Sequence, residues 1–314
     1  MLRTAILAAA RNRRIERMVT HAPVSRGVVT RFVGGADTAA GVSAARGLLA
    51  DGLTVTLDHL GEDTTDRAQA AATATAYTDL LDALHTAGLT ARLALLATRC
   101  EVSVKLSAVG QALGSDGGRI ALEHVRTICG HARRVNATVT LDMEDRTTTD
   151  STLEVLRQLR VDFPETGAVL QAYLRRTESD CRELAYAGSR VRLCKGAYDE
   201  PESAAFRERI DVDRSYVRCM NVLLAGDGYP MFATHDPTLI AIAADRATAY
   251  HKAGFEFQML YGIRPDEQRR LAAAGHTVRI YVPYGAQWYG YLMRRLAERP
   301  ANLGFFARAL VSKG

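Results

Sequence analysis

The chain has 314 residues, of which 47% are hydrophobic and 24% charged, and this composition excludes a disordered protein. The net charge of +5 at pH 7 favours anionic small ligands or an anionic membrane surface. Nucleic acid is not an expected partner, because the basic residues are spread along the chain among 35 acidic ones and form no cluster with interleaved aromatic residues.

The five cysteines are an odd number and none lies in a Cys-x-x-Cys pair. A disulfide framework or a zinc site is therefore not expected, and a reducing compartment such as the cytoplasm fits better. Near the N-terminus, the apolar stretch is short and an arginine cluster follows it, which favours an amphipathic helix over a signal peptide. The sequence has no run of 18 apolar residues, so no membrane span is predicted.

The first 50 residues predict an N-terminal segment of two or three helices with a break at Gly34–Gly35. From residue 51 to residue 314 a pattern repeats, in which a short β-branched run is followed by a turn and a stretch of helical period. Residues 89–100 also predict a helix. The eight runs that predict strands are residues 53–60, 102–108, 138–144, 168–174, 191–198, 230–236, 255–262 and 277–285.

Eight β-α units with no leftover strand predict an α/β fold, a closed (βα)8 TIM-like barrel with an N-terminal helical extension. The alternative is a doubly wound open sheet, which usually has fewer units and a dinucleotide-binding loop. No Gly-x-Gly-x-x-Gly follows a predicted strand and no P-loop sequence is present. These absences favour the barrel.

Polar residues lie at or near the C-terminal end of nearly every predicted strand, which is where barrel enzymes build their active sites. A single charge in a strand is commonly structural, because a buried charge must be paired. So many on one rim predict a ligand-binding site instead. They are Asp58, His59, Lys105, Asp142, Glu144, Gln171, Arg192, Lys195, Thr234, His235, Asp236, Gln258, Tyr261, Tyr281 and Tyr284.

The helix expected after the last strand places Tyr291, Arg294 and Glu298 on one face, with Arg295 at its border. Two arginines that point over the barrel mouth would form a clamp for a carboxylate. The alternative is an ordinary solvent-exposed helix with an ion pair between Arg294 and Glu298.

Three other kinds of protein are alternatives for a barrel with such a polar rim. A barrel metallohydrolase usually has a His-x-His on its first strand, and this chain has only the pair Asp58–His59. A Schiff-base lyase or aldolase needs a desolvated lysine, and Lys105 or Lys195 would serve. A non-enzymatic binding protein for an amino acid is the third alternative, and the many rim charges disfavour it.

Residues 31–309 resemble the monofunctional bacterial proline dehydrogenases and, more distantly, the matching domain of the bifunctional proline-utilisation flavoenzymes. This resemblance implies a (βα)8 barrel that holds FAD without a covalent link. It also implies oxidation of L-proline to Δ1-pyrroline-5-carboxylate and transfer of electrons to a quinone or another acceptor. The motifs that carry it are KLSAVG (105–110), LDMED (141–145), LQAYLRRTE (170–178), RLCKGAYDEP (192–201), FATHDP (232–237), FEFQMLYGIR (255–264) and RIYVPYGAQWYGYLMRRLAERPAN (279–302).

The resemblance also assigns roles to individual residues. Asp142 and Arg192 match the active-site carboxylate and arginine. The substrate residues would be Lys105, Arg294 and Arg295 at the proline carboxylate, Tyr281 and Tyr291 at the ring, and Glu298 beside the arginines. The FAD contacts would be Met143, Gln171, Cys194, Lys195, Gly196, Thr234 and His235. Cys194 stands where a valine is expected in the family, and a small apolar thiol is compatible with a backbone contact there.

The basic, partly apolar N-terminus is compatible with peripheral contact at the inner membrane face, which a quinone acceptor would require. A plain packing helix is the alternative. The sequence leaves open the physiological acceptor, the oligomeric state and the identity of any general base.

Overall fold

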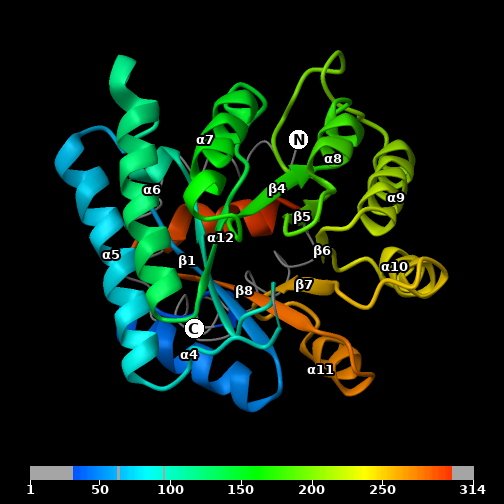
Figure 1. Cartoon of the computed structure of the whole chain (residues 1–314), viewed down its shortest axis with the longest axis horizontal. Helices are drawn as coiled ribbons and strands as arrows, with labels where there is room; N and C mark the ends of the chain where they lie inside the picture. Colours follow the sequence, from blue (N-terminus) through cyan, green and yellow to red (C-terminus); the bar gives the residue numbers. More distant parts are fainter. Residues whose placement is uncertain (1–30, 62–63, 95, 299–314) are drawn as a thin grey trace, which may run out of the picture.

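The computed structural model describes residues 31–61, 64–94 and 96–298, except for the side chains of residues 294–298. Eight parallel strands close into one barrel in chain order, with β1 paired to β8 (Figure 1). Each strand overlaps a predicted run, so the predicted (βα)8 barrel is confirmed. The strands are β1 (Thr54–His59), β2 (Cys100–Val104), β3 (Thr138–Leu141), β4 (Gly167–Gln171), β5 (Arg190–Cys194), β6 (Tyr229–Ala233), β7 (Glu256–Leu260) and β8 (Val278–Tyr284).

Helices follow the strands and surround the barrel (Figure 1). Aspartate side chains cap three of them, because Asp37, Asp66 and Asp236 accept hydrogen bonds from main-chain N–H groups of the first turns. The helices are α4 (Thr38–Ala50), α5 (Arg67–Thr86), α6 (Gly117–Arg134), α7 (Thr149–Asp162), α8 (Thr177–Leu184), α9 (Arg209–Ala225), α10 (Pro237–Ala249), α11 (Pro265–Ala273) and α12 (Trp288–Glu298).

Within the predicted N-terminal helical segment, α4 is a helix that packs against β1 and β8. The break before it is fixed to the barrel, since the Gly34 N–H donates to the Pro283 carbonyl at 2.8 Å and the Gly285 N–H donates to the Gly35 carbonyl at 2.9 Å. Residues 1–30, where the other predicted helices lie, are outside the described residues.

The prediction of a helix at residues 89–100 is wrong. Helix α5 ends at Thr86, and Gly88 then takes a left-handed φ of +70°. Arg92 and Thr98 form an isolated antiparallel bridge. The end of this segment must be extended, because the Arg99 carbonyl accepts a hydrogen bond from the Val55 N–H of β1 at 2.9 Å. Pairing with the barrel therefore overrides the helical propensity of the leucines and alanines.

The strands alternate between two kinds of side chain. Apolar residues such as Val102 and Leu193 point outward to the helices and form the main core. The residues between them are polar, so the interior of this barrel is filled by buried charges and hydroxyl groups as well as by apolar side chains. The period-2 alternation appears in the sequence as EVSVK (101–105) and RVRLC (190–194). It places the polar side chains inside the barrel, below the mouth formed by the strand ends.

Candidate active site

Asp142, Arg192 and Tyr281 come together at the barrel mouth, as the sequence predicted for an active site. Arg192 Nη1 donates to Asp142 Oδ1 at 2.8 Å, and the Tyr281 hydroxyl donates to Asp142 Oδ2 at 2.7 Å. The guanidinium carbon of Arg192 lies 5.4 Å from the centre of the Tyr281 ring. Burial alone would lower the pKa of Arg192, but the carboxylates of Asp142 and Glu101 outweigh it and raise that pKa. The guanidinium is therefore a fixed cation aimed by its carboxylate.

Lys105 forms a second cluster with Asp58, whose side chain is only 1% exposed. Lys105 Nζ donates to Asp58 Oδ2 at 2.7 Å, and the Tyr77 hydroxyl lies 3.3 Å from Asp58 Oδ1. Burial raises the pKa of Asp58, an effect that Lys105 opposes and the nearby charge of Asp142 reinforces. The charges of the Lys105–Asp58 cluster and of the cluster around Asp142 therefore influence each other.

Asp58 is one of the polar residues at the predicted rim, but the family resemblance gives it no role in the active site. A repeated sequence does point to it. The pentapeptide TVTLD occurs twice, at 54–58 in β1 and at 138–142, where β3 ends. The two copies end in Asp58 and Asp142. Equivalent strands of one parallel barrel bring equivalent residues to the same rim, so the repeat pairs Asp58 with the predicted catalytic carboxylate.

The residues predicted to contact FAD lie along the ends of β4, β5 and β6 and in the segment after β3. Gln171 Nε2 donates to the Glu144 carbonyl at 2.7 Å, which fixes the segment that contains the half-buried Asp142 and the buried Met143. Burial raises the pKa of the Cys194 thiol to about 12, so this residue is a neutral packing group and not a nucleophile.

His235 Nε2 accepts a hydrogen bond from the Leu260 N–H at 2.8 Å. In a neutral ring the proton is then on Nδ1, which fixes the tautomer. Thr234 turns its hydroxyl to accept from the Asp236 N–H at 3.1 Å, at the start of α10. The end of β6 is therefore ordered by its own hydrogen bonds.

A cavity of about 360 Å³ opens where β5 ends. Its wall includes three cationic side chains, those of Lys195, Arg207 and Arg209, and three carboxylates, those of Asp199, Glu200 and Asp213. Each of the three cations already pairs with an aspartate, so a phosphate group would compete with these ion pairs. Gly196 also lies in the wall, with φ at +106°, and a Cβ there would come within 2.1 Å of the Tyr173 ring. The Tyr173 ring can lie this close to the main chain only because Gly196 lacks a side chain. Lys195 and Gly196 are the residues of this wall that would contact the FAD that the resemblance implies.

Replacing Gly196 with alanine is expected to cost about 2 kcal/mol or more of stability, because it adds a clash to a strained φ. Flavin content should fall as well. Gly275→Ala is the matched control, since Gly275 has φ at +88° and open space where its Cβ would lie. Thermal melting and flavin absorbance of both variants check this. Equal losses in the two variants would contradict a special role for the Tyr173 contact.

Both lysines of the Schiff-base alternative are engaged with carboxylates. Lys105 pairs with Asp58, and Lys195 Nζ lies 3.1 Å from Asp236 Oδ2 and also contacts Asp213. A Schiff-base nucleophile requires a desolvated, neutral amine, and paired ammonium groups do not provide one. The geometry disfavours the lyase.

On α12, the buried Tyr291 packs with Val33 and Leu60, beyond the end of β1. Its predicted place at the proline ring stays a prediction. The side chains of Arg294, Arg295 and Glu298 are outside the described residues, so the predicted carboxylate clamp stays a prediction too.

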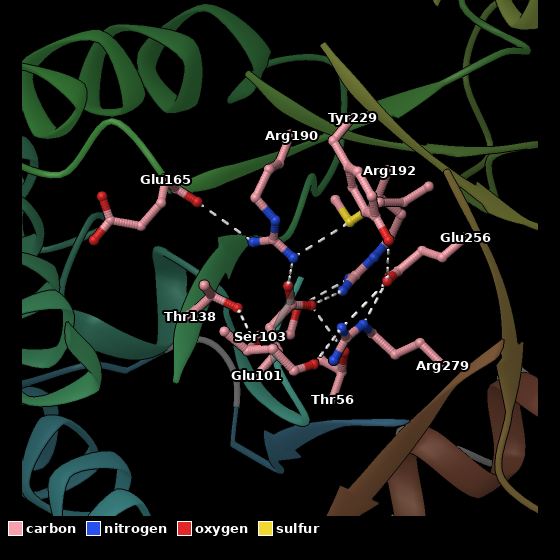
Figure 2. Close-up of polar contacts among 12 residues, drawn as sticks. Thr56, Glu101, Ser103, Thr138, Glu165, Arg190, Arg192, Tyr229, Glu256 and Arg279 are labelled. Atoms are coloured by element: carbon pink, nitrogen blue, oxygen red, sulfur yellow. Dashed lines mark hydrogen bonds and ion pairs between the residues drawn. The ribbon is translucent and has the colours of Figure 1, made fainter. Parts of the chain in front are cut away.

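Below the mouth lies a set of buried ion pairs that sequence reasoning missed (Figure 2). Arg192 Nη2 donates to Glu101 Oε1 at 2.9 Å, and Arg190 pairs with the other oxygen of Glu101. Arg279 Nε donates to Glu256 Oε1 at 2.7 Å. Burial would raise the pKa of Glu101, but Arg190, Arg279 and Arg192 together hold it well below its usual range. The interior carboxylate is therefore ionised.

Comparison with known proteins agrees with this geometry. The family model for proline dehydrogenase matches residues 42–308. The chain is 36% identical to a proline dehydrogenase of Deinococcus radiodurans over 315 residues, which is 99% of this chain and 98% of the relative. It is also 36% identical to proline dehydrogenase 1 of Bacillus subtilis, over 90% of each chain.

Among solved structures, proline utilization A from Bdellovibrio bacteriovorus, inactivated by N-propargylglycine, superposes with a TM-score of 0.80 at 24% identity. This match covers 92% of the present chain and 34% of the longer protein, and it supports the barrel fold alone. The sequence matches show more than the fold, because the family model spans all eight strands and the Deinococcus radiodurans relative covers 99% of this chain. By its sequence over nearly its whole length, the chain belongs to the proline dehydrogenase family.

Proposed function

We propose that this chain oxidises L-proline to Δ1-pyrroline-5-carboxylate, with non-covalently bound FAD as the oxidant. The observation that carries the proposal is the joint placement of Lys105–Asp58 and Arg192–Asp142–Tyr281 at one barrel mouth. The names of the two bacterial relatives support the same reaction. On this proposal residues 51–314 form the flavin-binding catalytic barrel and residues 1–50 an N-terminal extension.

Each cluster has a task in this reaction. When bound, FAD would supply the acceptor for the hydride that leaves C5 of the proline ring. Lys105, together with Arg294 and Arg295, would bind the substrate carboxylate, which is the anionic group of proline. Arg192 places a fixed positive charge where negative charge develops during reduction. Asp142 and Tyr281 keep that charge aimed.

The purified protein should be yellow, and denaturation should release FAD because no covalent link is proposed. L-Proline added without oxygen should bleach the flavin and give a product that reacts with o-aminobenzaldehyde. Absorbance spectra and chromatography of the released cofactor check both steps. A colourless protein that FAD does not reconstitute, but that borohydride traps as an adduct on Lys105 or Lys195, would contradict the proposal and favour the Schiff-base lyase.

A quinone or a similar acceptor is proposed to reoxidise the flavin, in the cytoplasm and in peripheral contact with the inner face of the membrane. The five free cysteines support a reducing compartment. Within the described ranges, no helix has the length and apolar character needed to cross a bilayer. Peripheral contact, which needs no such helix, therefore rests on the basic N-terminal sequence.

A further inference from the structure

Glu101 lies beside the guanidinium of Arg192 and is fully buried (Figure 2). Its Oε1 accepts from Arg192 Nη2 at 2.9 Å and from the Thr56 hydroxyl at 2.8 Å. Its Oε2 accepts from Arg190. Glu101 is thus a single carboxylate shared by two guanidinium groups, of which only that of Arg192 reaches the mouth of the barrel.

The guanidinium of Arg192 is held from two sides. Nη1 donates upward to Asp142 at 2.8 Å and to the Ser103 hydroxyl at 3.0 Å, while Nη2 donates downward to Glu101. Without Glu101, Nη2 of Arg192 would lose this hydrogen-bond acceptor, and the guanidinium could rotate or shift toward Asp142. Supporting contacts of this kind orient catalytic groups, and a misplacement of about 1 Å can lower the rate by about 100-fold.

We propose that Glu101 is a positioning residue for Arg192, an inference that rests on the proposed function. Glu101 fixes the lower edge of the guanidinium and balances part of its charge. Arg190 pairs with the other oxygen of Glu101, but Arg279 and Arg192 also favour the ionised carboxylate, so Arg190 is not needed for this positioning. Glu101 thus acts on the reaction only through Arg192.

The test compares Glu101→Gln with Glu256→Gln in the FAD-loaded protein. Both glutamates are fully buried in the barrel interior and ion-paired, but Glu256 pairs with Arg279 and makes no contact with Arg192. For Glu101→Gln we expect kcat with proline to fall at least about tenfold, with KM changed less than about threefold. Glu256→Gln should keep both constants within about threefold of the wild type while losing stability.

The reduction potential of the bound flavin gives a second readout that a merely structural role would not move. Removing one negative charge below Arg192 should favour the reduced flavin. We expect at least about a tenfold change in the two-electron equilibrium, or about 30 mV, in Glu101→Gln. A potential unchanged from the wild type together with an unchanged kcat overturns the proposal, and so does an equal loss of kcat in the two variants.

Glu101→Gln leaves the Arg190 charge without a partner and could fail to fold for that reason. The double variant Glu101→Gln with Arg190→Met removes the stranded charge but still deprives Arg192 of its anchor. The melting temperature of the double variant should be closer to that of the wild type than the melting temperature of Glu101→Gln, and its kcat should stay low. Recovery of kcat in the double variant overturns the proposal, and so does a double variant that does not fold. Failure of the proposed function would appear in the wild type itself, as a flavin that L-proline does not reduce.

Discussion

Replacing Arg192 with methionine is expected to lower kcat for proline oxidation by about 100-fold or more, since a fixed cation at the site of developing charge contributes about 3 kcal/mol. The variant should still fold, because Asp142 keeps the hydrogen bond from Tyr281 and Glu101 keeps its pair with Arg190. Stopped-flow reduction of the flavin by L-proline measures the effect directly.

Arg190→Met is the matched control for this variant. Arg190 lies two residues away on β5, is fully buried and pairs with the same Glu101, but it makes no contact with Asp142. We expect it to destabilise the fold and leave the rate of flavin reduction within about threefold of the wild type. Similar rates in the Arg190 and Arg192 variants would show that buried charge in general, and not Arg192, supports the reaction.

The arginines of α12 should give the second largest effect. Replacing Arg294 or Arg295 with methionine is expected to lower kcat/KM for proline at least about tenfold, since a charge-assisted hydrogen bond contributes about 1.5–3 kcal/mol. Lysine should not restore activity, because it keeps the charge but lacks the planar fork. FAD should stay bound, because these residues are assigned to the substrate. Steady-state kinetics and flavin spectra of each variant check these points.

A surface ion pair provides the control for the arginines. Arg269→Met removes the exposed pair between Arg269 and Asp266 on α11, and it should cost less than about 1 kcal/mol and leave the kinetics unchanged. If Arg294 merely pairs with Glu298 in solvent, its variant should behave in the same way. Unchanged kcat/KM in both arginine variants would remove the carboxylate clamp from the proposed function.

The barrel was predictable because its signal is local. Each strand is a short β-branched run, and eight such runs with helices between them leave few other topologies. The error at residues 89–100 has a non-local cause: LTARLALLATRC has helical composition, but the main chain at Arg99 must pair with Val55 in a strand 44 residues away. Local propensity carries no information about that partner.

The residues of the candidate site also divide into those that the sequence identified and those that it did not. The strand-end rule and the family motifs found Asp142, Arg192 and Tyr281, which the structure brings together. They did not identify Glu101, because its partner Arg190 is 89 residues away and a glutamate in an alternating strand looks like a solvent-facing residue. The expectation that polar side chains of a strand face water fails inside a closed barrel, where both faces are covered.

The buried charges are also divided unequally along the chain. The carboxylates of Glu101 and Asp142, on β2 and directly after β3, pair with cations from the second half of the barrel. Asp58 and Lys105 pair with each other within the first half. Strands β5 to β8 supply Arg190 and Arg192, and Arg279 and Glu256 cancel within that half.

Two surplus anions in one half therefore meet two surplus cations in the other when the barrel closes. A barrel assembled from two copies of either half would bury four like charges with no partners, which is prohibitively costly. The interior thus makes the two half-barrels complementary and not interchangeable. Half of this chain is therefore not expected to form a stable barrel by dimerising.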